Sequence, residues 1–125
     1  KRGRCLAWDA TCPNTFATSH LSASSTAAGS AAAAAESKKL LKYRDIIAAV
    51  DFTPFAIETS GVWGEAALHL IKDIGCRLSA ANNDPRSTTF LRQLISMEVQ
   101  RGNAFCVLGT FPVQTCVDSL LPDFD

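Results

Sequence analysis

The chain has 125 residues, of which 47% are hydrophobic and 19% are charged, as is ordinary for one small globular domain. Its formal net charge is zero, so overall charge does not steer it to nucleic acid, and such contacts must come from local basic clusters. No run of eighteen apolar residues is present, which excludes a membrane-spanning helix.

The five cysteines are odd in number, widely spaced and without a C-x-x-C pair, which argues against a disulfide framework and a zinc site. We therefore expect a reducing, intracellular location, in the nucleus or the cytoplasm. The sequence begins without methionine on a basic segment, so we expect it to be a piece of a longer protein. A second basic cluster consists of Lys38, Lys39, Lys42 and Arg44.

The first predicted element is a strand over residues 5–11, which a proline and an asparagine end. Because side chains alternate along a strand, Asp9 shares a face with the small residues Ala7 and Thr11. A carboxylate in the middle of a strand needs a partner, because an unpaired charge is expensive to bury. A metal ion or a lysine from a nearby helix would each serve, and we expect Asp9 to have both.

Residues 14–25 are rich in serine and threonine and are predicted to form a surface loop. A helix is predicted from about residue 31 to residue 50, because alanine has the highest helix propensity and apolar residues recur at helical spacing after it. A second strand is predicted over residues 52–59, with Pro54 near its beginning. The stripe of the helix that is expected to be buried consists of Leu40, Tyr43, Ile47 and Val50.

A second amphipathic helix is predicted over residues 63–81 and a third over residues 85–104. Asp84 is expected to be the N-cap of the third helix, with Pro85 at its first position. Residues 105–111 are apolar and fit either a last strand or a continuation of the helix.

The order β-α-β-α-α predicts an α/β fold, a small mixed sheet flanked by helices, with a right-handed crossover if the first two strands are parallel. The domain is expected to cover residues 1–111, and residues 112–125 are expected to form a tail. The side chains expected in the core are Leu6, Trp8, Leu40, Tyr43, Ile47, Phe55, Ile57, Leu68, Ile71, Leu91, Leu94 and Ile95.

Asp9 and the lysines of the first helix are the candidate chemical groups. A metal-dependent nuclease needs carboxylates to hold Mg²⁺, and usually a lysine that orients or activates water and offsets phosphate charge. Restriction-type nucleases commonly carry an acid-x-lysine triplet on a strand, but the second residue after Asp9 is Thr11. Lys39 or Lys42, on a helix against the strand, would supply the ammonium group instead. The alternative on spacing alone is an ordinary strand acid and a solvated helix face.

Several motifs of the chain resemble the C-terminal region of animal non-LTR retrotransposon polyproteins, over roughly residues 4–108. They are W-D-A-T-C-P at 8–13, K-x-x-K-Y at 39–43, A-I-E-T-S-G-V-W-G at 56–64, D-P-R-S-T at 84–88 and Q-R-G-N-A at 100–104. The resemblance implies a restriction-like endonuclease of the PD-(D/E)XK superfamily, which follows a reverse transcriptase and nicks DNA with Mg²⁺.

The resemblance also implies roles for individual residues. Asp9 matches the strand aspartate of the active site, which is a metal ligand, and Lys39, Lys42 and Tyr43 match the lysine-tyrosine motif. The expected partners are DNA, the RNA of the element and the remainder of the polyprotein.

One departure from the family pattern affects the expected activity. The pattern carries an arginine-proline-aspartate just upstream of the strand, and this chain starts after the place where it would stand. We therefore expect a fold that is incomplete at its N-terminus and a piece that is inactive, because one carboxylate cannot close a Mg²⁺ site. The alternatives are a non-catalytic nucleic-acid-binding or protein-binding module of a transposon-derived protein, and a degenerate copy without function.

Two further features have alternative interpretations. Glu58 ends the second strand, and in a parallel pair it would lie near the same end of the sheet as Asp9, as an additional acid of the site. Its alternative is a helix-capping or salt-bridging carboxylate. Trp8 and Trp63 fit either base stacking or core packing, of which core packing is preferred.

Overall fold

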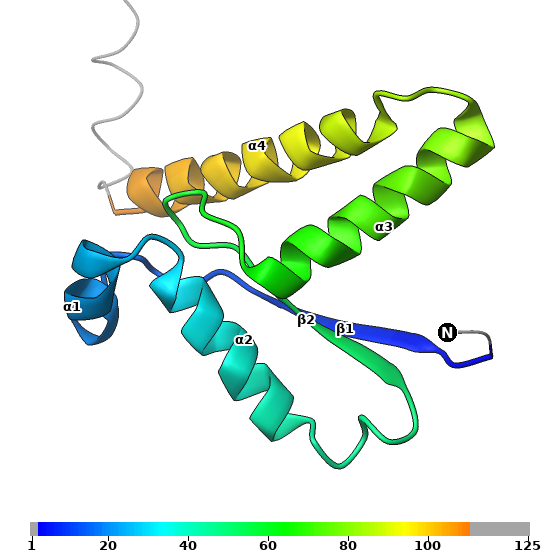
Figure 1. The fold of residues 1–125 in the computed structure, drawn as a ribbon. Helices are drawn as coiled ribbons and strands as arrows, with labels where there is room; N and C mark the ends of the chain where they lie inside the picture. The colour runs from blue at the N-terminus through cyan, green and yellow to red at the C-terminus, as the bar shows by residue number, and fades with distance from the viewer. Residues whose placement is uncertain (1–2, 111–125) are drawn as a thin grey trace, which may run out of the picture.

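The computed structural model describes residues 3–110 and has a mixed α/β architecture (Figure 1). In this part of the chain, four helices accompany a two-stranded sheet. The elements are β1 (Leu6–Thr11), α1 (Thr18–Thr26), α2 (Ser30–Lys42), β2 (Asp51–Ala56), α3 (Glu65–Asn82) and α4 (Ser87–Leu108). The α/β class is confirmed, while the predicted tail, residues 112–125, lies outside the described residues.

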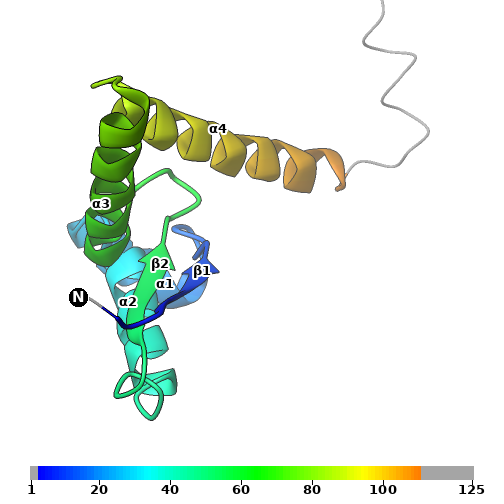
Figure 2. The ribbon, with the colours of Figure 1, turned by 90° about the vertical axis from the view of Figure 1, so that its right-hand side faces the viewer.

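The sheet is parallel, with Leu6 opposite Asp51 and Thr11 opposite Ala56. The predicted alternation of β1 is present, because Leu6 and Trp8 are exposed whereas Ala7 and Asp9 are less exposed on the other face. Helices α2 and α3 both contact β2. Figure 2 shows β2 between α3 and β1, so β1 is the strand that lies farther from α3.

The prediction of a surface loop over residues 14–25 is wrong, because α1 begins at Thr18 and ends at Thr26. Serine and threonine hydroxyls usually compete with helix formation by bonding to nearby backbone groups. In α1 the hydroxyls of Ser25 and Thr26 donate to the carbonyl oxygen of Ser22 at 2.8 and 2.9 Å, which is compatible with the helix. None of the residues of α1 is buried, so α1 is a surface helix. The predicted order of elements, β-α-β-α-α, lacks this helix, which precedes α2.

The first predicted helix is also shorter than expected, because α2 ends at Lys42 and not at residue 50. The guanidinium group of Arg4 donates to three carbonyl oxygens within residues 47–50, at 2.7 to 2.9 Å. These carbonyl groups are held by a side chain from the beginning of the chain, and residues 44–49 form turns. The chain just after the end of this helix is therefore held by a residue more than forty positions away in the sequence.

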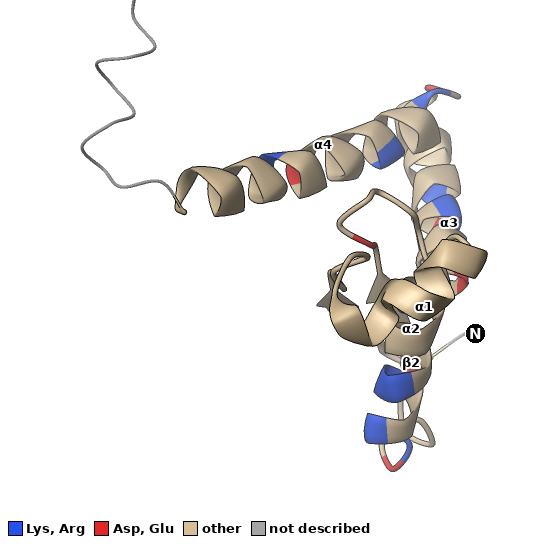
Figure 3. Cartoon of the chain, turned by 90° about the vertical axis from the view of Figure 1, so that its left-hand side faces the viewer, with Lys and Arg blue, Asp and Glu red and all other residues tan. Residues whose placement is uncertain are grey.

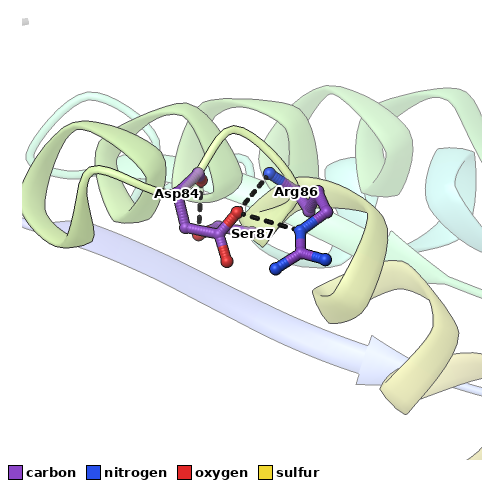
Figure 4. A network of polar contacts seen from close by, with 3 residues as sticks. All are labelled: Asp84, Arg86 and Ser87. Atoms are coloured by element: carbon purple, nitrogen blue, oxygen red, sulfur yellow. Dashed lines mark hydrogen bonds and ion pairs between the residues drawn. The ribbon is translucent and has the colours of Figure 1, made fainter.

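The predicted helices over 63–81 and 85–104 are present as α3 and α4. Helix α4 continues to Leu108, so residues 105–108 continue the helix and do not form a last strand. Asp84 does not act as the N-cap residue, because α4 begins at Ser87 with Arg86 before it. Instead, Asp84 shapes the turn between the helices (Figure 4). Its Oδ1 accepts the backbone N–H of Arg86 at 2.9 Å, and its carbonyl oxygen accepts the Ser87 hydroxyl at 2.9 Å.

The core is small and lies where α2, β2 and α3 meet. Its buried hydrophobic residues are Ala31, Ala32, Ala56, Ile57, Ala67, Leu70 and Ile71. The predicted core is wrong for Leu6, Trp8, Leu40, Leu68 and Leu94, which are exposed. Leu6 and Trp8 lie on the same face of β1, as the alternation of side chains predicts. They are nevertheless exposed, because α2 lies against the opposite face of the sheet.

The contact between α3 and α4 depends on a glycine. A Cβ atom at Gly75 would lie 2.3 Å from Thr88 Oγ1 and 2.8 Å from Thr88 Cα, which is closer than real Cβ contacts allow. We expect Gly75→Ala to lower the free energy of unfolding by about 1–3 kcal/mol, because the two helices must separate. Urea denaturation followed by circular dichroism measures this change.

Gly102 provides the matched control, because it lies inside α4 and a Cβ atom there would have no neighbour within 4 Å. Gly102→Ala should raise the free energy of unfolding by up to about 1 kcal/mol, since alanine favours the helix. Equal effects of the two substitutions would contradict the close approach at Gly75.

Candidate functional site

The candidate site lies between β1 and the end of α2, where Asp9 meets two side chains of the K-x-x-K-Y motif. The ammonium group of Lys39 forms an ion pair and hydrogen bond with Asp9 Oδ2. The hydroxyl of Tyr43 donates to the same oxygen at 2.8 Å. The predicted contact between the helix and the Asp9 carboxylate is therefore confirmed, although Lys39 is 30 and Tyr43 is 34 positions away from Asp9 along the chain.

Local structure explains how these side chains converge. Asp9 projects from the face of β1 on which its neighbours are small, and Lys39 follows Glu36 along the inner face of α2. The ring of Tyr43 lies against Phe52 of β2, with 4.8 Å between ring centroids, so the sheet positions its hydroxyl. The side chains of Asp9 and Lys39 are 29% and 21% exposed, so solvent reaches the pair.

Lys42 lies beside the pair and does not contact Asp9 directly. Its Nζ is 4.8 Å from the centroid of the Tyr43 ring, a distance typical of a cation–π contact. Hydrogen bonding to Tyr43 raises the pKa of Lys42, and the charge of Asp9 adds a smaller effect in the same direction. Lys42 therefore presents a positive charge at the solvent-exposed side of the site.

The environment of Asp9 favours its ionised form. The hydrogen bond from Lys39 lowers the pKa of the Asp9 carboxyl group most, and the hydrogen bond from Tyr43 lowers it further. A carboxylate with a lowered pKa in the folded protein stabilises the fold above its ordinary pKa of about 3.9. This contribution is lost as the pH falls through the folded pKa.

We expect Asp9→Asn to lower the melting temperature at neutral pH, because it removes the charge that Lys39 pairs with. The difference from the wild type should stay constant down to about pH 4 and shrink below it, as the wild-type carboxylate is protonated. Thermal unfolding followed by circular dichroism over a pH series measures both proteins. Asp73→Asn is the matched control, because the Asp73–Arg77 pair is exposed, and its effect should be small throughout.

The residues of this site do not fit a Mg²⁺ ion without further ligands. Asp9 contributes one carboxylate, and its Oδ2 already accepts hydrogen bonds from Lys39 and Tyr43. Among residues 3–110, no group of three or more histidine, cysteine, aspartate or glutamate side chains is arranged to hold a metal ion. Magnesium is usually bound through carboxylates that leave room for its water molecules.

Glu58 is not brought to Asp9. It lies two residues after Ala56, which is opposite Thr11, so it is displaced from Asp9 by about 13 Å along the strands. It is 1% exposed, and its Oε1 accepts the backbone N–H of Ala32 at the beginning of α2, at 3.1 Å. This contact agrees with the helix-capping alternative.

The second oxygen of Glu58 joins the two loops that follow the strands. Its Oε2 accepts the hydroxyl of Thr15 at 2.9 Å and that of Ser60 at 3.3 Å. Thr15 follows β1 and Ser60 follows β2. Glu58 therefore ties both loops to the N-terminus of α2, where a negative charge is stabilised by the helix dipole.

Glu36 is a second buried carboxylate, and no sequence pattern pointed to it as a functional residue. It accepts the backbone N–H groups of Ala66 and Ala67, each at 3.2 Å, at the beginning of α3. A Cβ atom at Gly64 would lie 2.1 Å from its Oε1, so this contact requires the glycine. The sequence signal is weak, since it consists of one acid after an alanine run and one glycine before a distant helix.

Core packing is the wrong interpretation for Trp8, which is 60% exposed. Trp63 is only partly exposed and makes an edge contact with Phe55, with 5.9 Å between ring centroids. Phe55 also contacts Trp8 edge to face, at 6.1 Å. The aromatic rings thus form a row that ends at an exposed indole.

The described residues contain four cysteines. Cys5, Cys12, Cys76 and Cys106 are free thiols, and Cys116 lies outside the described residues. No helix within residues 3–110 combines the length and apolar character needed to cross a bilayer.

Comparison with known proteins returned no match of this chain to a protein-family model, to a curated protein or to a solved structure.

Proposed function

We propose that this chain is part of a restriction-like, DNA-nicking endonuclease domain of a retrotransposon polyprotein that acts with a reverse transcriptase. The observation that carries the proposal is the contact of Lys39 and Tyr43 with one oxygen of Asp9. The resemblance assigns these residues to an active site, and the fold brings them together across thirty residues of sequence. The alternative, an ordinary strand acid beside a solvated helix face, does not require both side chains to contact one oxygen of the carboxylate.

The cluster offers the groups that a phosphodiester site uses. Lys39 keeps Asp9 ionised, and Tyr43 supplies a hydroxyl donor. Lys42 is exposed and close enough to offset the charge of a bound phosphate. In the proposal, the Mg²⁺ that this chemistry needs is held by Asp9 together with the carboxylate of the arginine-proline-aspartate segment of the family pattern. The described residues alone are expected to bind nucleic acid without cutting it.

The basic residues around the C-terminal end of α2 support nucleic acid as the partner. Figure 3 shows lysine and arginine positions at this end of the helix. Lys38, Lys42 and Arg44 are exposed, and the last turn of α2 also favours positive side chains through the helix dipole. Phosphate groups of DNA, or of the element's RNA, are the ligands that such a cluster would bind.

The binding test uses this chain and a labelled DNA duplex at several salt concentrations. We expect the logarithm of the binding constant to fall linearly with the logarithm of the salt concentration. Replacing Lys38, Lys42 and Arg44 by alanine should weaken binding and flatten the slope by about 0.9 for each phosphate group that is no longer neutralised. Fluorescence anisotropy measures both quantities.

The control variant carries alanine at Arg77 and Arg92, which are exposed residues of α3 and α4. It removes positive charge elsewhere on the molecule and should leave the salt slope unchanged. An equal loss of binding in the two variants would contradict an interface at the end of α2. Asp9→Ala should keep its affinity to a first approximation, because affinity depends on many phosphate contacts.

A second candidate function is a non-catalytic nucleic-acid-binding module. The observation that favours it is that the described part of the chain brings one carboxylate, already paired with Lys39, to the site. The two functions agree on DNA binding and differ in whether a protein with the complete site cleaves DNA.

A further inference from the structure

Two of the free thiols, those of Cys12 and Cys106, line one cavity between the sheet and α4. The cavity has a volume of about 550 Å³, and most of its wall is apolar, with Phe55 and Ile57 on the side of the sheet and Val99 on the side of α4. Cys12 directly follows β1, and Cys106 lies in the last turn of α4. The fold therefore brings two thiols from nearly opposite ends of the described chain to the same space.

Hydrogen bonds connect the segments that carry these thiols. The backbone N–H of Thr59 donates to the carbonyl oxygen of Pro13 at 3.0 Å, and the side-chain amide of Asn103 donates to the carbonyl oxygen of Thr59 at 2.7 Å. Pro13 is the residue after Cys12, and Asn103 lies one helical turn before Cys106, on the same face of α4. Figure 1 shows the loop after β2 reaching toward this end of α4. This loop thus links the backbone beside one thiol to the helical turn before the other.

The electrostatic environment of Cys12 also includes the second thiol. Desolvation by surrounding groups raises the pKa of the Cys12 thiol, and the charge of Cys106 raises it further. A like charge disfavours the ionised form of a group only when the two lie near each other. This effect agrees with the position of both thiols at one cavity.

Helix α4 is not fixed in place by a packed core. None of its residues is buried, and the cavity leaves space between α4 and the end of β1. Gly102 lines this cavity, and a Cβ atom at its position would have no neighbour within 4 Å. A disulfide needs two Cα atoms about 4.4–6.8 Å apart. The open space allows α4 to approach β1 without displacing tightly packed side chains.

We propose that Cys12 and Cys106 form a reversible disulfide when hydrogen peroxide oxidises the protein, and that this bond fastens the C-terminal half of α4 to the end of β1. In a reducing compartment, disulfides are usually transient and redox-sensing, so this pair is compatible with the lack of a disulfide framework. The inference goes beyond the proposed endonuclease function and does not depend on it.

The reaction has two steps and balances with one molecule of peroxide. The thiolate sulfur of one cysteine attacks a peroxide oxygen, the O–O bond breaks, hydroxide leaves and a sulfenic acid forms. The second thiolate attacks the sulfur of the sulfenic acid, the S–O bond breaks and hydroxide leaves again. The two thiol protons convert the two hydroxide ions to water. Two electrons pass from the sulfur atoms to the peroxide, and a reducing thiol such as glutathione returns them by thiol–disulfide exchange.

A variant with serine at Cys5, Cys76 and Cys116 keeps the proposed pair and tests whether the two thiols react with each other. One equivalent of hydrogen peroxide should remove both thiols, as counted with a thiol-specific dye. The intact mass of the monomer should fall by the mass of two hydrogen atoms, and dithiothreitol should restore it. Persistence of both thiols, or a gain of oxygen without a disulfide, would overturn the proposal.

The matched control keeps Cys12 and Cys76 and has serine at the other three cysteines. Cys76 is an exposed thiol of α3 and does not line the cavity. This variant should form no disulfide within the monomer under the same conditions. If it formed one as readily as the Cys12–Cys106 variant, the cavity would not be what brings the thiols together, and the proposal would fail.

The wild type tests the same bond without any substitution. Peptide mapping of the oxidised protein should find Cys12 joined to Cys106, and a bond from either of them to another cysteine instead would overturn the assignment. The oxidised protein should unfold at a melting temperature at least about 5 °C above that of the reduced protein, because the bond closes a long loop of the unfolded chain. Cys106→Ser should show no such rise. An oxidised wild type with an unchanged melting temperature would contradict the fastening of α4.

Discussion

A protein that carries the family's arginine-proline-aspartate segment ahead of this chain is expected to nick supercoiled plasmid DNA in Mg²⁺, and Asp9→Ala should abolish the nicking. The substitution removes the one carboxylate that the described residues bring to the site. The chain without that segment should show little or no nicking under the same conditions. Agarose gel electrophoresis of the relaxed product measures the rate.

In the same nicking protein, Lys42→Ala should lower the rate by about a hundredfold or more, because loss of one electrostatic stabiliser typically has such an effect. Arg77→Ala is the control, since Arg77 is exposed and pairs with Asp73 on α3. Its nicking rate should stay close to that of the wild type. Undiminished nicking by Asp9→Ala would refute the site assignment, and a longer protein that binds DNA without ever nicking it would favour the binding module.

Glu58→Ala is expected to lower the free energy of unfolding by about 2–4 kcal/mol. The substitution leaves the N–H of Ala32 and the hydroxyl of Thr15 without their acceptor in a buried position. It also removes a negative charge from the N-terminus of α2. Urea denaturation at neutral pH measures the change.

Two further substitutions sharpen this test. Glu58→Gln keeps the shape and one acceptor oxygen, so it should lose less stability than Glu58→Ala. Glu65→Ala changes an acid that is 89% exposed at the beginning of α3, and its effect should stay within about 1 kcal/mol. A Glu58→Ala protein as stable as the wild type would contradict the structural role. In the nicking protein, loss of activity by a stable Glu58→Gln variant would instead support the additional acid that the sequence suggested.

Local sequence patterns were sufficient for most of the elements and for the pairing at the site. The alternation of β1, the alanine content of α2 and the apolar spacing of α3 each act over a few residues, so each is readable along the chain. The convergence on Asp9 was also predictable, because a helix between two neighbouring strands packs back onto their sheet. Which lysine would pair with Asp9 stayed open, since Lys39 and Lys42 are three residues apart and lie on nearby parts of one helix face.

Contacts between distant segments decided the remaining features. Arg4 holds the carbonyl groups after α2, and Glu58 accepts a donor of α2, over separations that no local pattern encodes. Periodicity shows which side chains share a face, but burial also requires another element to cover that face. Trp8 is exposed because α2 lies on the other face of the sheet, which is the face of Asp9. The choice between the two faces of the sheet is made by packing, whose energy depends on the whole arrangement of helices around it.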